Sequence, residues 1–167
     1  MNILSFDIGT RHLAYCLVQY QNSNVADILE WKLIDLVKEL QNTKRITPEA
    51  LTVFLNAKFQ SILPKLHTVL IENQVQNSKM KNIQMILHTY FAMQNGIQIH
   101  VCNANQKYEG TGLQSYGKRK KYSVETIRAY LRNEAHLSKY LHHLDLFRKK
   151  DDLTDSLLQI IVWGKNN

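Results

Sequence analysis

The sequence predicts an α/β domain in which helices flank a mixed five-stranded sheet. Three apolar runs near the N-terminus follow one another with only short polar breaks, which is typical of an antiparallel meander. Segments with helix and strand character alternate after them, which fits a mixed sheet covered by helices. A chain of 167 residues can bury a substantial core, and no repeat or linker divides it. We therefore expect a single domain over residues 1–167.

The first three elements are predicted to be strands. Residues 2–8 form a short apolar run that contains one acid and ends at Gly9. Residues 12–20 are rich in aromatic and β-favouring types, and residues 25–34 continue in the same way after the polar turn at 21–24. Short breaks between such runs favour antiparallel pairing of neighbours.

The next segment is predicted to be a helix followed by a strand. Thr47 is a suitable N-cap and Pro48 fits the first helical position. Apolar residues then recur at helical spacing as far as Leu63, and Pro64 lies at the end of this pattern. Residues 67–72 are an apolar, β-branched run that ends in a carboxylate, which predicts a strand.

Four further elements and one loop are expected in the second half. In chain order they are a helix over 79–94, a strand over 97–102, a loop over 103–122, a helix from the N-cap Ser123 to about residue 136, and a final helix over 151–163. The loop contains three glycines and shows no periodicity. Loops of this length inside compact domains are often functional.

The charge of the chain suggests a polyanionic partner. The net charge is +7 and the pI is near 9.4, which either keeps the protein soluble or serves to bind phosphates. The positive charge is concentrated in the compact clusters 118–121 and 148–150, and the second cluster directly precedes an acidic motif. This distribution favours nucleic acid as the partner.

The cysteines and the hydropathy pattern predict an intracellular protein. Cys16 and Cys102 both lie inside apolar runs, which is typical of small core residues in a reducing compartment. No apolar run approaches the roughly 20 residues that span a bilayer. The N-terminal segment has neither the positive region nor the cleavage-type sequence of a secretory signal.

Four carboxylates are candidates for a metal site. Asp7 lies in an otherwise apolar strand, where an ionised acid is costly unless it is paired or binds a cation. Glu72 ends a second buried strand, and Asp152 and Asp155 project from one side of the last helix. Simpler explanations exist for some of these acids: Asp7 can accept hydrogen bonds from its own turn, and the helix dipole favours acids at a helix N-terminus, which fits Asp151 better than Asp155.

Taken together, these acids predict a two-metal hydrolytic site. Phosphodiester cleavage needs a water that is nucleophilic at neutral pH and stabilisation of the leaving 3′-oxygen, and two cations roughly 4 Å apart can provide both. Oxygen ligands favour Mg²⁺, with Mn²⁺ as a substitute, over zinc. Lys120 or Lys121 could neutralise charge that develops on the phosphate, although plain contacts with the DNA backbone explain either lysine equally well.

Three segments resemble the RuvC-like Holliday junction resolvases of the RNase H-like superfamily, and in particular their poxvirus-type branch. These segments are FDIGT on the first strand, IENQ at the end of the fourth strand and KKDDLTDSLLQ at the start of the last helix. The resemblance implies an RNase H-like fold with three antiparallel and two parallel strands. It also implies an Mg²⁺-dependent endonuclease, a homodimer that makes symmetric nicks in four-way and branched DNA. Such enzymes act in DNA recombination and repair and in resolving replicated viral concatemers, in the host-cell cytoplasm if the protein is viral.

The resemblance also assigns the residues of the active site. The family's first-strand aspartate falls on Asp7, its central glutamate on Glu72, and its helical aspartate pair on Asp152 and Asp155. These four acids are therefore the expected catalytic and metal-binding residues, with two ions in each site.

The poxvirus-type enzymes also use a lysine from a basic loop. Here that lysine falls among Lys118, Lys120 and Lys121, and Lys120 is the catalytic candidate. The basic side chains expected to contact DNA are Arg11, Lys118, Arg119, Lys120, Lys121, Lys149 and Lys150.

The predicted helix over 79–94 has more apolar surface than one face of a sheet requires. Its apolar residues are Met80, Ile83, Met85, Ile86, Leu87, Tyr90 and Phe91. This surface indicates either the dimer interface or ordinary core packing.

Three rival functions fit part of the pattern. An actin-like or sugar-kinase-like ATPase also begins its phosphate loop with DIGT, but it needs a second half and a second glycine-rich loop. A YqgF-like nuclease acting on RNA would have a glycine-proline-rich turn after the fourth strand, which is missing here. A non-catalytic DNA-junction-binding module would have no need to keep all four acids.

Overall fold

The computed structural model of the chain describes residues 1–40 and 46–167. The strands are β1 (Asn2–Ile8), β2 (His12–Gln21), β3 (Asn24–Asp35), β4 (Leu66–Glu72) and β5 (Gln98–Cys102). The α-helices are α1 (Leu36–Glu39), α2 (Pro48–Phe59), α3 (Ser78–Ala92), α4 (Tyr116–Asn133), α5 (Tyr140–Asp145) and α6 (Lys150–Lys165). Short 3₁₀ helices are η1 (Leu63–Lys65), η2 (Ala104–Tyr108) and η3 (Ala135–Leu137).

The strands form one mixed sheet in the order β3-β2-β1-β4-β5. β2 pairs antiparallel with both β1 and β3, whereas β4 pairs in parallel with both β1 and β5. The predicted mixed five-stranded sheet is confirmed. Because β1, β4 and β5 run in the same direction, their carboxyl ends meet at one edge of the sheet, where functional side chains of α/β proteins collect.

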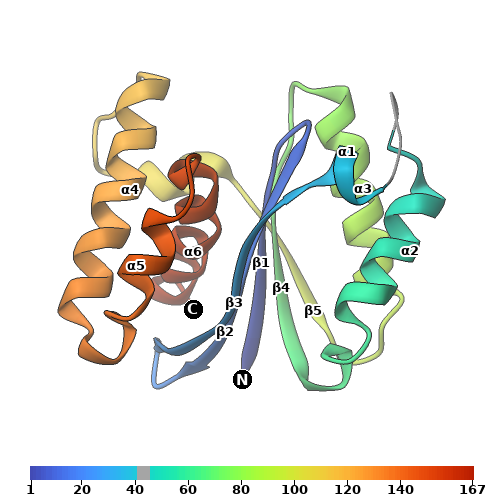
Figure 1. The fold of residues 1–167 in the computed structure, drawn as a ribbon, viewed down its shortest axis with the longest axis horizontal. Helices are drawn as coiled ribbons and strands as arrows, with labels where there is room; N and C mark the ends of the chain where they lie inside the picture. The colour runs from blue at the N-terminus through green and yellow to red at the C-terminus, as the bar shows by residue number, and fades with distance from the viewer. Residues whose placement is uncertain (41–45) are drawn as a thin grey trace.

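Helices cover both faces of the sheet, with α1, α2 and α3 on one side and α4, α5 and α6 on the other (Figure 1). The first core is aromatic: the ring of Phe59 lies edge-on to Phe6 at 5.7 Å and to Tyr15 at 5.2 Å. In the second core the indole Nε1 of Trp31 donates to the carbonyl of Leu153 at 2.8 Å. This bond fixes α6 to β3 and with it the acids that α6 carries.

Thr47 and Pro48 begin α2 as the sequence predicts. The Thr47 Oγ1 accepts a hydrogen bond from the backbone N–H of Ala50 at 3.3 Å, and Pro48 occupies the first helical turn. This cap satisfies one of the N–H groups that a helix leaves without an internal partner.

Two predictions for the second half are wrong: the loop over 103–122 and the N-cap at Ser123. Part of this stretch is η2, and α4 already begins at Tyr116 with Ser115 as its N-cap. None of the α4 residues before Ser123 is buried, so this part of the helix shows no apolar periodicity. Ser123 instead lies inside the helix, with its Oγ 2.9 Å from Oγ1 of Thr154 on α6.

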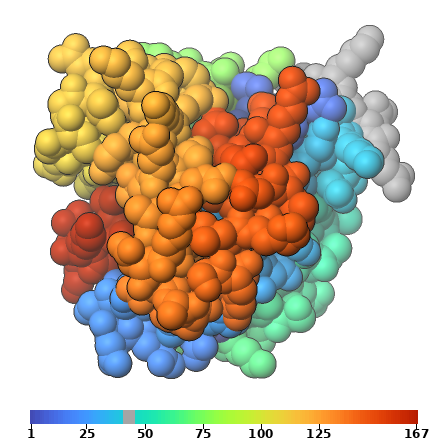
Figure 2. Space-filling view, turned by 60° about the vertical axis from the view of Figure 1, so that its left-hand side comes forward, coloured from blue at the N-terminus to red at the C-terminus, as the bar shows by residue number. Residues whose placement is uncertain are grey.

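On the face that Figure 2 brings forward, α4 lies beside the segment that runs through α5 into α6. The sequence did not predict α5, whose six residues are too few to display a helical period. A groove of about 500 Å³ between these segments is lined mainly by basic side chains. Its lining residues are Lys120, Lys121, Val124, Glu125, Arg128, Arg148, Lys150 and Asp151.

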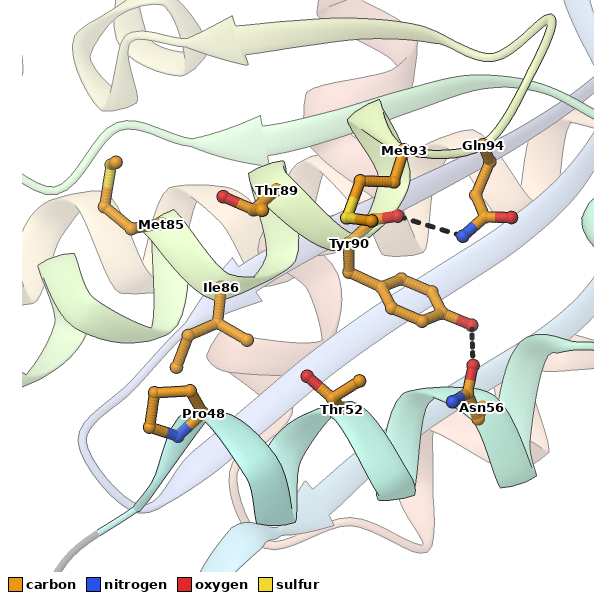
Figure 3. Close-up of a pocket in the computed structure, with 9 residues that line it drawn as sticks. All are labelled: Pro48, Thr52, Asn56, Met85, Ile86, Thr89, Tyr90, Met93 and Gln94. Atoms are coloured by element: carbon orange, nitrogen blue, oxygen red, sulfur yellow. Dashed lines mark hydrogen bonds between the residues drawn. The ribbon is translucent and has the colours of Figure 1, made fainter.

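A second groove, of about 440 Å³, lies between α2 and α3 on the opposite helical layer (Figure 3). Across it the hydroxyl of Tyr90 donates to Oδ1 of Asn56 at 3.0 Å. Of the apolar residues on the predicted helix, Ile83 and Leu87 are buried in the core, whereas Met85 is exposed beside the groove. Core packing therefore accounts for part of this helix's apolar character, and an exposed apolar strip remains.

The two cysteines are free thiols, with Cys16 buried and Cys102 half-buried. Burial raises the pKa of the Cys102 thiol to about 11. Among the helices of the described ranges, none combines the length and the apolar character needed to cross a bilayer.

Candidate active site

Three of the predicted acids lie together at the carboxyl edge of the sheet. Asp7 is near the end of β1 and Glu72 ends β4, and the parallel register that pairs Phe6 with Ile71 sets the two acids side by side. Helix α6 packs across β1 and brings Asp155 to the same point. The sequence separates these acids widely, and the sheet topology joins them.

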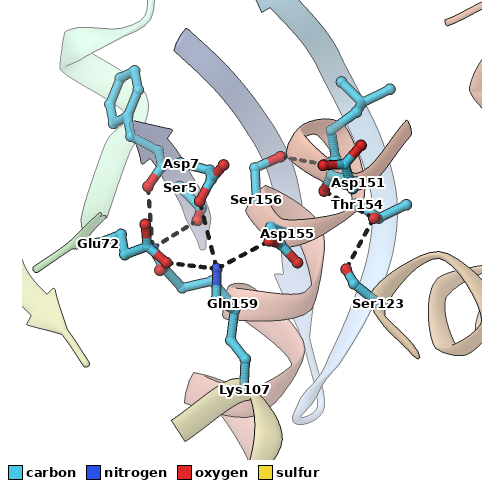
Figure 4. Close-up of polar contacts among 12 residues, drawn as sticks. Ser5, Asp7, Glu72, Lys107, Ser123, Asp151, Thr154, Asp155, Ser156 and Gln159 are labelled. Carbon is cyan, nitrogen blue, oxygen red and sulfur yellow. Dashed lines mark hydrogen bonds and ion pairs between the residues drawn. The ribbon is translucent and has the colours of Figure 1, made fainter. Parts of the chain in front are cut away.

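The ammonium of Lys107 lies at the centre of this group (Figure 4). Its Nζ is 2.8 Å from Oε1 of Glu72, 3.5 Å from Oδ1 of Asp7 and 3.7 Å from Oδ2 of Asp155. The Lys107 side chain is only 3% exposed. We call Asp7, Glu72, Lys107 and Asp155 the carboxylate–lysine cluster.

Burial and the neighbouring charges set the protonation of Asp7 and Glu72. Burial raises the pKa of Asp7 well above its ordinary range; the charge of Lys107 opposes this, and that of Glu72 adds to it. Burial acts on Glu72 in the same direction, but the ammonium of Lys107 and hydrogen bonds to the carboxylate prevail and lower its pKa. The two acids therefore differ: Asp7 holds a proton more tightly, and Glu72 stays ionised.

Asp155 and Lys107 respond to the same surroundings. Burial raises the pKa of Asp155, although Lys107 counteracts the effect. Burial would lower the pKa of Lys107, but the three carboxylates outweigh it and raise that pKa above its ordinary value. Lys107 is therefore a permanent positive charge inside the cluster.

Neighbouring polar groups hold the acids in place. Gln74 donates from Nε2 to Oε2 of Glu72 at 2.9 Å, and its own backbone N–H donates to Oε1 of Gln84 at 2.7 Å. The hydroxyl of Tyr108 donates to Oδ1 of Asp155 at 3.3 Å. These contacts restrict the orientation of the two carboxylates.

Asp152 lies apart from the cluster in this structure. Its Oδ2 is 3.8 Å from Nζ of Lys149, and no hydrogen bond or ion pair among the described residues joins it to Asp7, Glu72 or Asp155. Burial and then the charge of Asp151 raise the pKa of Asp152. Its assignment as a metal ligand stays a prediction.

Lys120 also lies outside the cluster. It forms an ion pair with Asp151 at the start of α6, and its Nζ is 4.7 Å from the centre of the Tyr116 ring. Burial would lower the pKa of Lys120, but its contacts with Asp151 raise it. The structure thus brings Lys107, and not the predicted Lys120, to the acids.

The remaining predicted DNA contacts lie on several elements. Lys118 and Lys121 are exposed on α4, and the Arg119 guanidinium lies 5.2 Å from the Tyr108 ring. Arg11 donates to Asp35 from Nε and Nη2, at 2.9 and 2.6 Å. Two more predicted DNA-contacting residues lie at the start of α6: Lys149 faces Asp152, and Lys150 donates to the carbonyl of Phe147 at 3.0 Å.

Sequence reasoning missed Lys107 because it lies in the segment that was taken for a loop. A local signal was present: Asn103 and Gln106 form a capping box around η2, in which each side chain accepts from the other residue's backbone N–H. This motif directly follows β5 and marks a short helix that points its next residue, Lys107, toward the ends of the parallel strands.

The donor set of the cluster fits a divalent cation of the Mg²⁺ or Mn²⁺ kind. All three acids offer oxygen, which these cations prefer. As the side chains stand, no three His, Cys, Asp or Glu residues within 1–40 and 46–167 are arranged to hold one ion. Asp7, Glu72 and Asp155 instead share the ammonium of Lys107. The donors are suitable for a divalent cation, and the ammonium of Lys107 lies between them.

The chain is similar to known proteins in both sequence and fold. Residues 1–164 match the family described as Poxvirus A22 protein. The structure is similar to that of fowlpox virus resolvase in complex with its substrate Holliday junction DNA, with a TM-score of 0.72, 19% identity, and coverage of 99% of this chain and 98% of that one. No match was found among curated protein sequences.

Two further structures share the fold. The yeast mitochondrial Holliday junction resolvase Ydc2 is similar with a TM-score of 0.66 and 18% identity, over 98% of this chain and 77% of that one. RuvC of Thermus thermophilus is similar with a TM-score of 0.59 and 11% identity, over 99% and 96% of the two chains. The expected RNase H-like fold of the RuvC type is thereby confirmed.

Proposed function

Because the chain belongs to the Poxvirus A22 protein family, we propose that it is a Holliday junction resolvase, an endonuclease that cleaves four-way and branched DNA. The observation that carries this function is the convergence of Asp7, Glu72 and Asp155 around Lys107 at the carboxyl edge of the sheet. Both cores are built on the same sheet, which supports a single nuclease domain over residues 1–167.

The carboxylate–lysine cluster is the proposed catalytic centre. Asp7, Glu72 and Asp155 would hold Mg²⁺, for which Mn²⁺ would substitute, with two ions in each site. Asp152 would join them, because it lies one turn before Asp155 on α6 and its contact with the exposed Lys149 is long, at 3.8 Å. Surface ion pairs of this kind contribute little and are readily exchanged.

The bound cations would supply the Lewis acidity that makes a water nucleophilic and stabilises the departing 3′-oxygen. Lys107 would neutralise negative charge on a non-bridging oxygen of the scissile phosphate, because a lysine ammonium is charged at neutral pH. Tyr108 and Gln74 would keep Asp155 and Glu72 in a fixed orientation. Preorganised charges of this kind lower the barrier without rearranging during the reaction.

The basic side chains beside the cluster would bind the DNA backbone. Lys118 and Lys121 project from α4, and Lys149 and Lys150 begin α6 on the same side of the sheet. Phosphate contacts position a duplex without reading its sequence. Selectivity for junctions would therefore come from the shape of branched DNA.

Symmetric cleavage needs two active sites, so we propose that the protein works as a homodimer. The apolar strip along the α2–α3 groove, where Met85 and Met93 are exposed, is the surface that suits self-association. The relevant setting is DNA recombination and the resolution of viral concatemers, in the cytoplasm of the host cell.

A cleavage assay tests the proposal. Purified protein with Mg²⁺ should cut a synthetic four-way junction at paired, symmetric positions and leave linear duplex of the same sequence intact. Asp155→Asn should abolish cleavage and keep junction binding, whereas Glu39→Gln on α1, in the opposite helical layer, should cut like the wild type. A wild type that binds the junction and never cuts it would indicate a non-catalytic binding module. Preferential cutting of RNA would indicate the YqgF-like alternative.

Two further variants test the individual assignments. Asp152→Asn should also abolish cleavage, and persistent cleavage would remove Asp152 from the site. Lys107→Ala should lose more activity than Lys120→Ala, because only Lys107 contacts the acids. The reverse order would restore Lys120 as the catalytic lysine.

A further inference from the structure

Lys107 is placed unusually for a lysine that serves only to contact DNA. Its side chain is 3% exposed, and its ammonium contacts three carboxylates from β1, β4 and α6 rather than the solvent. Burying an ammonium is costly unless charged partners compensate it. The fold therefore stabilises this lysine among the acids before any substrate is present.

The charge of the cluster is suited to exchanging this lysine for another cation. Asp7, Glu72 and Asp155 must all be ionised to bind a metal, and in that state one ammonium leaves two of their negative charges uncompensated. A divalent cation would balance the same three carboxylates more completely, and carboxylate oxygens bind Mg²⁺ at about 2.0–2.1 Å. In this structure the ammonium lies 2.8 to 3.7 Å from each acid, and among the described residues the acids are not arranged to share one ion.

The space around Lys107 allows it to move. A cavity of about 70 Å³ borders its side chain, between η2 and the end of α6, with Cys102, Gln159 and Trp163 among its lining residues. This volume exceeds the roughly 30 Å³ that one water occupies, so the Lys107 side chain has free space beside it in which to shift. The 3₁₀ hydrogen bonds of η2 are also weaker than those of an α-helix, which permits a small shift of its backbone.

We propose that Lys107 is a built-in counter-ion, which occupies the cation position in the metal-free protein and is displaced from it when a divalent cation binds. This inference rests on the proposed metal-dependent nuclease and adds an order of events to it. The ammonium holds the three acids together while the site is without metal. Once displaced, it stays at the margin of the site, where it can meet the phosphate of the substrate.

Chemical modification of the wild type tests the displacement directly. The full chain, without DNA, is treated with formaldehyde and a borane reductant with and without saturating Mn²⁺, and each lysine is followed by mass spectrometry. Lys107 should be protected in the metal-free protein and become reactive with Mn²⁺, while the exposed Lys65 should react equally in both. Protection of Lys107 that persists at saturating Mn²⁺ overturns the proposal.

Metal affinity supplies the second measurement, read from the electron paramagnetic resonance signal of free Mn²⁺. Lys107→Met should bind Mn²⁺ about tenfold more tightly or better, because a positive charge no longer competes for the acids. Lys65→Met is the matched control and should bind like the wild type. Unchanged affinity in Lys107→Met, or a wild type without saturable binding, overturns the proposal.

The two measurements separate occupancy from simple charge repulsion. Tighter binding by Lys107→Met, with Lys107 still protected in the Mn²⁺-loaded wild type, would mean that charge alone opposes the metal, and the proposal would fail. Should Lys107→Met not fold, the modification of the wild type still decides. Junction cleavage with Mg²⁺ on the same preparation is independent: a protein that cuts while Lys107 stays protected keeps the proposed function and loses this inference.

Discussion

Shortening Leu157 to alanine should destabilise the protein strongly, because this side chain fixes α6 to the sheet. Leu157 has no exposed surface and lies in the second core, two residues after Asp155. Removing its buried carbon groups at about 0.8 kcal/mol per CH₂ accounts for about 2.4 kcal/mol. The remaining cavity adds to this, and the strands and α4 around it limit collapse, so we expect about 3–4 kcal/mol in total.

Urea unfolding followed by circular dichroism measures this loss. The midpoint should fall while the dependence on urea stays the same, and the melting temperature should drop by about 6–16 °C, at about 2–4 °C per kcal/mol for a chain of this size. Leu146→Ala is the matched control, since Leu146 is 68% exposed. We expect that variant to change stability by less than about 0.5 kcal/mol.

Comparing Leu157→Ala with Leu146→Ala tests whether close packing holds α6 against the sheet. A loss below about 1 kcal/mol in Leu157→Ala, or a loss equal to that of Leu146→Ala, would refute the conclusion that α6 is held by close packing. It would also remove the physical reason for the fixed position of Asp155. A changed dependence on urea would indicate instead that the substitution alters how much surface unfolding exposes.

Three other variants give distinct readouts. Burial raises the pKa of Asp7, so its protonated form stabilises the metal-free fold below the ordinary value of 3.8, and this contribution is lost as the pH rises through the folded pKa. Asp7→Asn should weaken this loss of stability, which is measured as urea midpoints taken from acidic to neutral pH. A pH profile identical to that of the wild type would contradict the prediction. Thr47→Ala should lower the free energy of unfolding by about 1 kcal/mol and leave junction cleavage unaffected, because it removes only the N-cap of α2. Reduced cleavage by the folded variant would show that α2 contributes to the active site. The Lys121 side chain is 77% exposed, and Lys121→Ala should remove one phosphate contact. The slope of log binding constant against log salt concentration, measured by fluorescence anisotropy, should then become shallower by about 0.9. An unchanged slope would place Lys121 outside the DNA interface.

The fold was largely predictable because its signals are local. Residues 2–8 and 67–72 are apolar runs of strand length, and Thr47 with Pro48 forms a cap that works through neighbouring backbone atoms. Such patterns depend on burial on one or both faces of an element, which the sequence displays directly. The start of α4 escaped prediction for the opposite reason, since none of its first residues is fully buried and most of them carry charges.

The site was predictable only in part, because it depends on contacts between distant segments. Asp7 and Glu72 could be recognised as acids at the ends of apolar strands. For Lys107 the capping box indicates only that a short helix follows β5, and it takes the three-dimensional structure to show that η2 points into the ends of those strands. Asp152 and Asp155 looked equivalent at their helical spacing, but their contacts differ, with Asp155 facing Tyr108 and Lys107 and Asp152 facing Lys149.

The wide separation of the cluster along the chain has a consequence for how the protein matures. Lys107 and Asp7 are 100 positions apart, and Asp155 lies a further 47 positions beyond Tyr108, its hydrogen-bond partner. During synthesis the sheet strands emerge before α6, and segments fold in that order. A growing chain therefore lacks the complete carboxylate–lysine cluster until α6 docks. Under the proposed function, a partly folded intermediate would be unable to cleave DNA.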